Sequence, residues 1–172
     1  MADLFIDCEW SSKTQELFIL GAYSYGQNRF QLCDGAIDQN RFTNFLSACS
    51  KRGNCEPLLF VHGPDIAKIE DHFDTDLRHD LNCINTQTAF RRFTDVPSSG
   101  LKYLEKEFGL SREHDLNHFQ ISAYWKSKDL KKREIVLDYN WEDCVNLWKL
   151  VKILEKDFGV TREDLINEAR LY

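Results

Sequence analysis

Several features are scarce or absent in this 172-residue sequence, and each absence excludes a class of protein. No apolar run approaches the roughly 18 residues that a membrane-spanning helix requires, so we expect no membrane association. The first residues, Met1–Leu4, lack the basic stretch of a secretory signal, and we therefore expect a cytoplasmic location. The six cysteines include no CxxC pair, so buried reduced thiols are expected rather than disulfides or a zinc site.

Positive charge is also in short supply. The chain has 22 lysines and arginines against 28 aspartates and glutamates, which gives a net charge of −6. Proteins that coat long nucleic acids depend on many lysine and arginine contacts, so the charge argues against such a role. It does not argue against an enzyme that grips a few nucleotides, because metal ions bound to carboxylates reverse the local sign of charge.

Only three prolines interrupt the chain, and no linker, repeat or low-complexity segment divides it. We therefore predict one domain over residues 1–172. Apolar runs bounded by turn-forming residues predict strands, whereas apolar residues three or four apart predict helices. The predicted strands are 4–9, 17–25, 29–32, 58–61 and 81–84. The predicted helices are 37–49, one that follows Pro64, 98–108, 130–158 and a short one from Thr161.

The order of these elements predicts an α/β fold. The first three strands are close together in the sequence and can form an antiparallel meander. The later strands are reached through helices, so they should pair in parallel. We therefore expect a mixed central sheet, three antiparallel strands followed by parallel strands, flanked by helices.

Two acidic motifs near opposite ends of the chain are candidates for a metal site. Asp7 and Glu9 are two residues apart in the first predicted strand, so their side chains point the same way. Tyr139 and Asp143 are four residues apart in the long predicted helix, so they share a face. Three carboxylates and a phenol that face one point suit the two-metal cleavage of phosphodiesters. Each motif alone also fits solvated carboxylates and a half-buried tyrosine.

A third acidic candidate follows the strand predicted at 58–61. Asp65 lies at a predicted helix N-terminus, where free N–H groups favour a carboxylate whether or not a metal binds. Glu70 and Asp71, one to two turns further on, are alternatives for the same role. Asp65 is preferred because it comes directly off the strand end.

Basic residues next to aromatic ones precede Tyr139. Aromatic stacking combined with cations holds single-stranded nucleic acids without sequence preference. The same pattern also fits a helix with an apolar seam and a solvated face, which is how we interpret a second such cluster at 90–93. The lysines predicted to contact single-stranded DNA or RNA are Lys126, Lys128, Lys131 and Lys132.

These motifs resemble those of the DEDD (DnaQ-like) 3′–5′ exonucleases of the tyrosine subtype. The chain is most similar to the small RNase H-like domains of the YprB-like, or RNase H 2, family. Residues 4–9 resemble the first exonuclease motif, 58–65 the second, 98–110 a family helix and 139–147 the third. The third is the most specific, because its tyrosine, asparagine, aspartate and cysteine all agree in spacing.

The resemblance implies an RNase H-like fold and a metal-dependent 3′–5′ exonuclease that acts on single-stranded nucleic acid. The ligands that it implies for two Mg²⁺ or Mn²⁺ ions are Asp7, Glu9, Asp65 and Asp143. One ion would lower the pKa of the attacking water and the other would stabilise the leaving 3′ oxygen. Tyr139 would orient that water, because a phenol with a pKa near 10 is a poor base at neutral pH.

The chain departs from the family pattern at two places. His62-Gly63-Pro64 stands before Asp65 where many members carry an asparagine and an aromatic residue, and Asn85 stands where many members have an acid. These departures leave open a catalytically weak nucleic-acid-binding or scaffold module of a larger nuclease assembly. An RNase H-type endonuclease is a second alternative. The 2′-OH is read by pocket geometry, so DNA and RNA both stay open as substrates.

Overall fold

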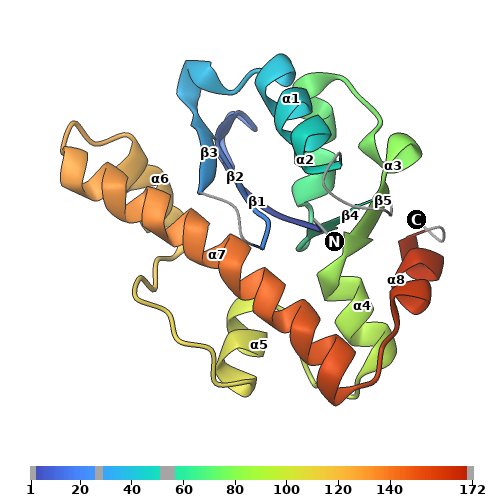
Figure 1. Ribbon diagram of the computed structural model, residues 1–172. Helices are drawn as coiled ribbons and strands as arrows, with labels where there is room; N and C mark the ends of the chain where they lie inside the picture. The colour runs from blue at the N-terminus through green and yellow to red at the C-terminus, as the bar shows by residue number, and fades with distance from the viewer. Residues whose placement is uncertain (1–2, 26–28, 51–56, 170–172) are drawn as a thin grey trace.

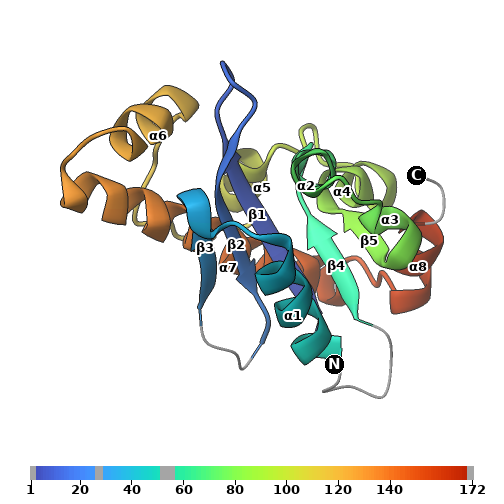
Figure 2. The ribbon, with the colours of Figure 1, turned by 90° about the horizontal axis from the view of Figure 1, so that it is seen from above.

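The computed structural model describes residues 3–25, 29–50 and 57–169. Its centre is a five-stranded sheet in the order β3-β2-β1-β4-β5, with helices on both faces (Figure 1, Figure 2). The strands are β1 (Leu4–Trp10), β2 (Leu17–Tyr23), β3 (Phe30–Cys33), β4 (Leu58–Val61) and β5 (Asn82–Asn85). The helices are η1 (Asp34–Ala36, 3₁₀), α1 (Gln39–Ser50), α2 (Asp65–Phe73), α3 (Leu77–Asp80), α4 (Thr86–Phe93), α5 (Leu101–Glu107), α6 (His118–Trp125), α7 (Leu130–Asp157) and α8 (Arg162–Ala169).

The pairing of the strands confirms the predicted mixed sheet. β1 is antiparallel to β2, and β2 is antiparallel to β3. β1 is parallel to β4, and β4 is parallel to β5. The register aligns Phe5 of β1 with Phe60 of β4, and their rings stack with centroids 4.9 Å apart. Parallel neighbours end at the same edge of a sheet, so the C-terminal ends of β1 and β4 lie together.

Alternation along β1 decides which side chains face which helices. Leu4 and Ile6 belong to the core beneath α1 and α2, whereas Phe5 belongs to the core beneath α7 on the opposite face (Figure 1). Asp7 and Glu9 continue the alternation of Phe5. They therefore project into the interface between the sheet and α7, where Glu9 is only 7% exposed.

Helix α7 is the second element on which the site depends. It packs across β1 and β2 and is capped by Asp129, which accepts a hydrogen bond from the Lys131 N–H. Its buried residues recur at helical spacing; they are Val136, Tyr139, Asn140, Asp143, Cys144, Asn146, Leu147, Leu150, Val151 and Leu154. The first half of this buried stripe is largely polar and the second half is largely apolar. The polar half is the part that meets the carboxylates of β1.

The short elements η1, α3 and α6 are not predicted by the sequence pattern. Helix α3 is a single turn in which Asp76 caps the chain by accepting from the His79 N–H at 3.0 Å. Leu77 is its one buried residue, so it presents no apolar period to recognise. Strand β2 also ends at Tyr23 rather than at Tyr25.

The five cysteines that the structure describes form no disulfide, and Cys55 lies outside the described residues. Cys8 of β1 and Cys144 of α7 are buried close to the acidic motifs, and burial raises the pKa of both thiols well above its ordinary value. They are therefore uncharged packing residues. Among the described helices, none is long and apolar enough to cross a membrane.

Helix α7 lies very close to the sheet at Gly21 of β2. A Cβ atom at this position would lie 2.1 Å from Oδ1 of Asn140 and 3.1 Å from Sγ of Cys144. Asn140 is fully buried, so its side chain has no open space into which it can move. Glycine at position 21 is thus what lets α7 lie flat over β1 and β2.

We expect Gly21→Ala to lower the free energy of unfolding by about 1–3 kcal/mol, the usual cost of overpacking a core. Urea denaturation measures the loss. Gly35→Ala is the matched control, because a Cβ there would meet nothing within 4 Å and stability should stay within about 1 kcal/mol of the wild type. Equal stability of the two variants would contradict the close packing of α7 on β2.

Candidate metal centre

Carboxylates from two elements converge at the C-terminal end of β1. Asp7 and Glu9 project from β1 and Asp143 from α7, and one oxygen of each lies within 4.8 Å of the others. Glu9 and Asp143 are buried, and Asp7 is half-buried. Mg²⁺ and Mn²⁺ prefer oxygen ligands of this kind. The structure therefore brings together the three carboxylates of the two acidic motifs.

Asp65 joins this group from the first residue of α2. It is 6% exposed, and its charge is, after burial, the largest cause that raises the pKa of Asp7, so the two carboxyl groups lie close together. Glu70, the alternative ligand, is engaged elsewhere: its carboxylate accepts from Nη2 of Arg78 at 2.6 Å and from the Arg78 N–H at 3.0 Å. Asp71 is exposed. The position of Asp65, rather than that of Glu70 or Asp71, suits a ligand.

The pKa of each of the four carboxyl groups is raised, and burial is the largest cause at every one. The charge of Asp65 further raises the pKa of Asp7, and the charge of Asp7 further raises those of Glu9 and Asp143. Burial, followed by the charge of Asp143, raises the pKa of Asp65 to about 8. Neutralising this repulsion is what a divalent cation would do, so the donor set fits a metal.

Asn140 fixes the orientation of Asp7. Its Nδ2 donates to Oδ2 of Asp7 at 2.7 Å and to the main-chain oxygen of Asp7 at 3.2 Å. Its Oδ1 accepts from Nε2 of Gln31 in β3 at 2.7 Å. The network links β3, α7 and β1 and satisfies a fully buried amide. Asn140 is part of the third motif, but the sequence alone assigns it no role.

Arg112 is a residue of this site that the sequence does not single out. Its guanidinium forms two bonds with the Glu105 carboxylate, at 2.6 Å from Nη2 and 3.0 Å from Nε, and also donates to Oδ1 of Asp143. Burial opposes the charged form of Arg112, but the charges of Asp143 and Glu105 outweigh burial and raise its pKa. Arg112 is thus a permanent cation at one side of the carboxylates. No pattern in the polar sequence around it predicts this role.

Tyr139 lies one turn before Asp143 on α7, as its spacing predicts. Its ring is buried, with the Arg112 guanidinium 4.7 Å from the ring centroid. Within the described part of the chain, its hydroxyl has no hydrogen-bond partner. Burial and then the charge of Asp143 raise the pKa of the phenol well above its ordinary value. Tyr139 therefore stays protonated at neutral pH and offers a donor rather than a base.

Asn85, one of the two departures from the expected family pattern, has a structural role. Its Oδ1 accepts from the Gly63 N–H at 3.2 Å, and its Nδ2 donates to the Gly63 carbonyl oxygen at 2.7 Å. Gly63 has a positive φ of 64°, which glycine adopts without strain. An ionised acid cannot donate to that carbonyl. Asn85 thus fixes the turn that leads into Asp65.

The predicted lysine cluster lies apart from the carboxylates. Lys126 and Lys128 are in the turn between α6 and α7, and Lys131 and Lys132 are in the first turn of α7. All four are exposed. About 18 Å of helix separates Lys131 from Asp143. The structure does not bring these lysines to the acidic site, and a contact with a strand that extends away from the site stays a prediction.

We expect Arg112→Gln to destabilise the metal-free protein by about 3–5 kcal/mol, because the change leaves Glu105 and Asp143 buried without their cation. Urea denaturation in EDTA measures the effect, and added Mg²⁺ or Mn²⁺ should restore part of the loss. Arg133→Gln is the matched control: its ion pair with Asp34 is partly exposed, at 33% and 52% for the two side chains, and should be worth less than about 1 kcal/mol. Equal losses in the two variants would mean that Arg112 does not neutralise the site.

Among solved structures, the chain is similar to the family B DNA polymerase from the hyperthermophilic archaeon Pyrobaculum calidifontis, with a TM-score of 0.69 and 13% sequence identity. The match covers 98% of this chain and 27% of the polymerase chain. At this identity the likeness concerns the fold alone. Comparison with curated proteins gives no match.

The family comparison covers nearly the whole chain. Residues 4–164 match the family model RNase_H_2, described as RNase_H superfamily. The matched range includes all four carboxylates, Tyr139 and Arg112. The chain therefore belongs to the RNase_H_2 family of the RNase H superfamily, and this membership supports a nuclease.

Proposed function

We propose that this protein is a metal-dependent 3′–5′ exonuclease that hydrolyses phosphodiester bonds of single-stranded nucleic acid. The observation that carries the proposal is the convergence of Asp7, Glu9 and Asp143 at one edge of the sheet, with Asp65 beside Asp7. In a chain of the RNase H superfamily, such a cluster is best explained by catalysis. The structural likeness to a DNA polymerase is consistent with a nucleic-acid substrate.

Asp7, Glu9, Asp65 and Asp143 would hold two Mg²⁺ or Mn²⁺ ions. When bound, the ions supply a lowered pKa for the attacking water and charge stabilisation for the leaving oxygen. Asn140 keeps Asp7 oriented and Arg112 keeps Asp143 oriented. Partners of this kind behind metal ligands typically contribute 10–100-fold in metal affinity or activity.

The Tyr139 hydroxyl supplies the orienting group in this proposal. It is protonated, it is unpaired among the described residues, and it is carried one helical turn from Asp143. A phenol in this state can donate to a water or to a phosphate oxygen, and can hold the attacking water in line. The tyrosine would therefore position a reactant, and the carboxylates would hold the ions that activate it.

We expect Asp143→Asn to lower cleavage at least about 100-fold, since changes behind metal ligands alone reach that size. The assay follows a 5′-labelled oligonucleotide with Mg²⁺ or Mn²⁺. A 3′–5′ exonuclease shortens the labelled strand one nucleotide at a time, whereas an endonuclease leaves internal fragments. Asp157→Asn, the same change at an exposed position of α7, is the control and should cut at the wild-type rate. Wild-type cleavage by Asp143→Asn would refute the site, and an inert wild-type protein would favour a binding module.

Tyr139→Phe keeps the ring and removes only the hydroxyl. We expect turnover to fall by roughly 10²–10⁴-fold, the range for general acid–base and orienting groups. Stability and Mn²⁺ affinity should change little, because the hydroxyl has no partner to lose. Single-turnover kinetics, urea denaturation and calorimetric Mn²⁺ titration separate these effects, with Tyr124→Phe on α6 as the control. Unchanged turnover would make Tyr139 a packing residue, and a large loss of stability would give its hydroxyl a structural role.

A further inference from the structure

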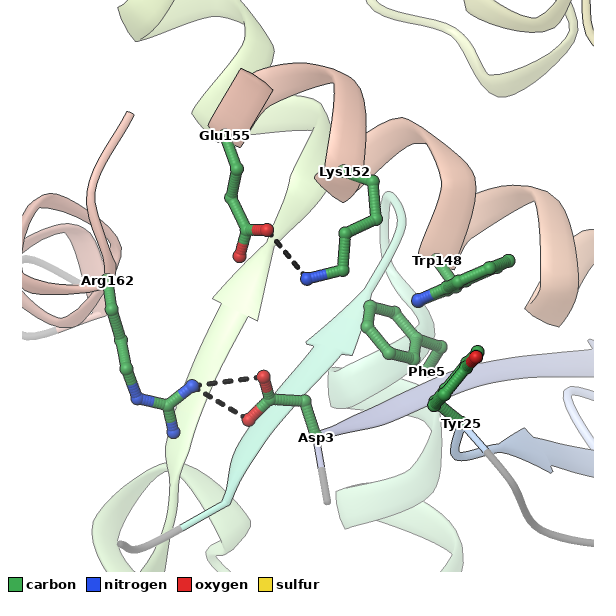
Figure 3. Close-up of a pocket in the computed structure, with 7 residues that line it drawn as sticks. All are labelled: Asp3, Phe5, Tyr25, Trp148, Lys152, Glu155 and Arg162. Atoms are coloured by element: carbon green, nitrogen blue, oxygen red, sulfur yellow. Dashed lines mark hydrogen bonds and ion pairs between the residues drawn. The ribbon is translucent and has the colours of Figure 1, made fainter. Parts of the chain in front are cut away.

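A cavity lies at the opposite end of β1 from the carboxylates. Its volume of about 490 Å³ is within the range of small-ligand sites. The residues that line it are Asp3, Phe5, Tyr25, Trp148, Lys152, Glu155 and Arg162 (Figure 3). About 13 Å of strand separates Asp3 from Asp7, so this cavity is distinct from the candidate metal centre.

Aromatic rings form one wall of the cavity. Tyr25 stacks on Trp148 with ring centroids 5.5 Å apart and planes 28° apart, and the Phe5 ring lies beside them (Figure 3). Tyr23 supports Trp148 from the sheet at 5.5 Å. Tyr25 is nevertheless 70% exposed, so core packing does not account for its position. The stack presents an aromatic surface to solvent at the cavity mouth.

Two ion pairs form the charged part of the rim. Nη1 of Arg162 donates to the two carboxylate oxygens of Asp3 at 2.8 and 3.0 Å. Nζ of Lys152 donates to Glu155 at 2.6 Å. Figure 3 shows both pairs beside the same space as the aromatic wall. The rim therefore offers donors and acceptors together, and the partly exposed pair of Lys152 and Glu155 can exchange partners at little cost.

We infer that this cavity binds a nucleobase. A base supplies a flat ring for the stack of Tyr25 and Trp148, and its edge carries both donors and acceptors for the mixed rim. A phosphate group would use the cations alone and be repelled by Asp3 and Glu155. An alkyl chain would make no hydrogen bond with the donors and acceptors of the rim. The base belongs to a single strand or to a free nucleotide, and the first source rests on the proposed function because it makes the cavity an additional contact for the substrate.

The proposed mode of binding also predicts how the site responds to salt. Phosphate contacts release counterions and weaken steeply as salt rises. Stacking of a base on an aromatic ring involves no net charge. The part of the affinity that depends on Tyr25 should therefore persist at high salt, in a protein whose net charge is −6.

Removal of the exposed ring tests the inference. In EDTA, where metal-dependent cleavage is prevented, fluorescence anisotropy measures binding of a fluorescein-labelled single-stranded DNA of mixed sequence. Tyr25→Ala should weaken binding about 5- to 140-fold, since one stacked base is worth roughly 1–3 kcal/mol and 1.4 kcal/mol is tenfold. Tyr25→Phe keeps the ring and should bind like the wild type. The same difference should remain after the salt concentration is raised.

Two further probes identify the source of the base. An abasic strand of equal length should bind both variants alike, and competition by AMP or GMP would reveal a site for free nucleotides. Equal binding of the base-bearing strand by Tyr25→Ala and Tyr25→Phe would overturn the inference. So would an equal loss for the abasic strand, or no binding by the wild type of either the strand or the mononucleotides. A wild type that binds through Tyr25 but fails to cleave with Mg²⁺ would refute the exonuclease and leave the cavity assignment standing.

Discussion

Burial of like charges between β1 and α7 is the constraint on which the rest of the site depends. Asp7 and Glu9 face α7 because they share the alternation of Phe5, and α7 presents Asp143 to them. Burial and, after it, the repulsion between these carboxylates raise their pKa values. The sheet and helix still meet here because Leu147, Leu150 and Leu154 bury apolar surface over the rest of the interface. The apolar half of α7 thus holds the polar half in place.

The surrounding residues stabilise these buried carboxylates in different ways. Asn140 donates to Asp7, and Arg112 sets a cation against Asp143. Glu105 in turn holds Arg112, and Asn146 donates to Glu105 at 2.9 Å. Gly21 has no side chain, whereas a larger residue at this position would displace Asn140. The site is therefore a polar layer built into the core and supported from β2, β3 and α5, rather than a group of acids on a surface.

The sequence predicts the scaffold and the acids much better than their supports. Apolar alternation and helical spacing predict the five strands, α7 and the faces of Asp7, Glu9 and Asp143, because these patterns are local. The contact of Arg112 with Asp143 joins residues 31 positions apart, and no periodicity connects a loop arginine to a helix aspartate. The sequence favours Asp65 over Glu70 because Asp65 follows a strand end, but it does not show that Glu70 binds Arg78, which lies after the end of α2. The cavity beside Trp148 combines four separate segments and has no sequence motif.

The cation of Arg112 beside the carboxylates has a consequence for the order of folding and metal binding. Small zinc domains fold only when metal is present, because metal binding supplies the free energy of folding. Here Arg112 supplies positive charge to the acidic layer, so the sheet and α7 can pack together before a metal ion binds. In the proposed nuclease, folding and metal binding would then be separate steps. The protein would fold without metal, and the availability of metal would govern its activity but not its folding.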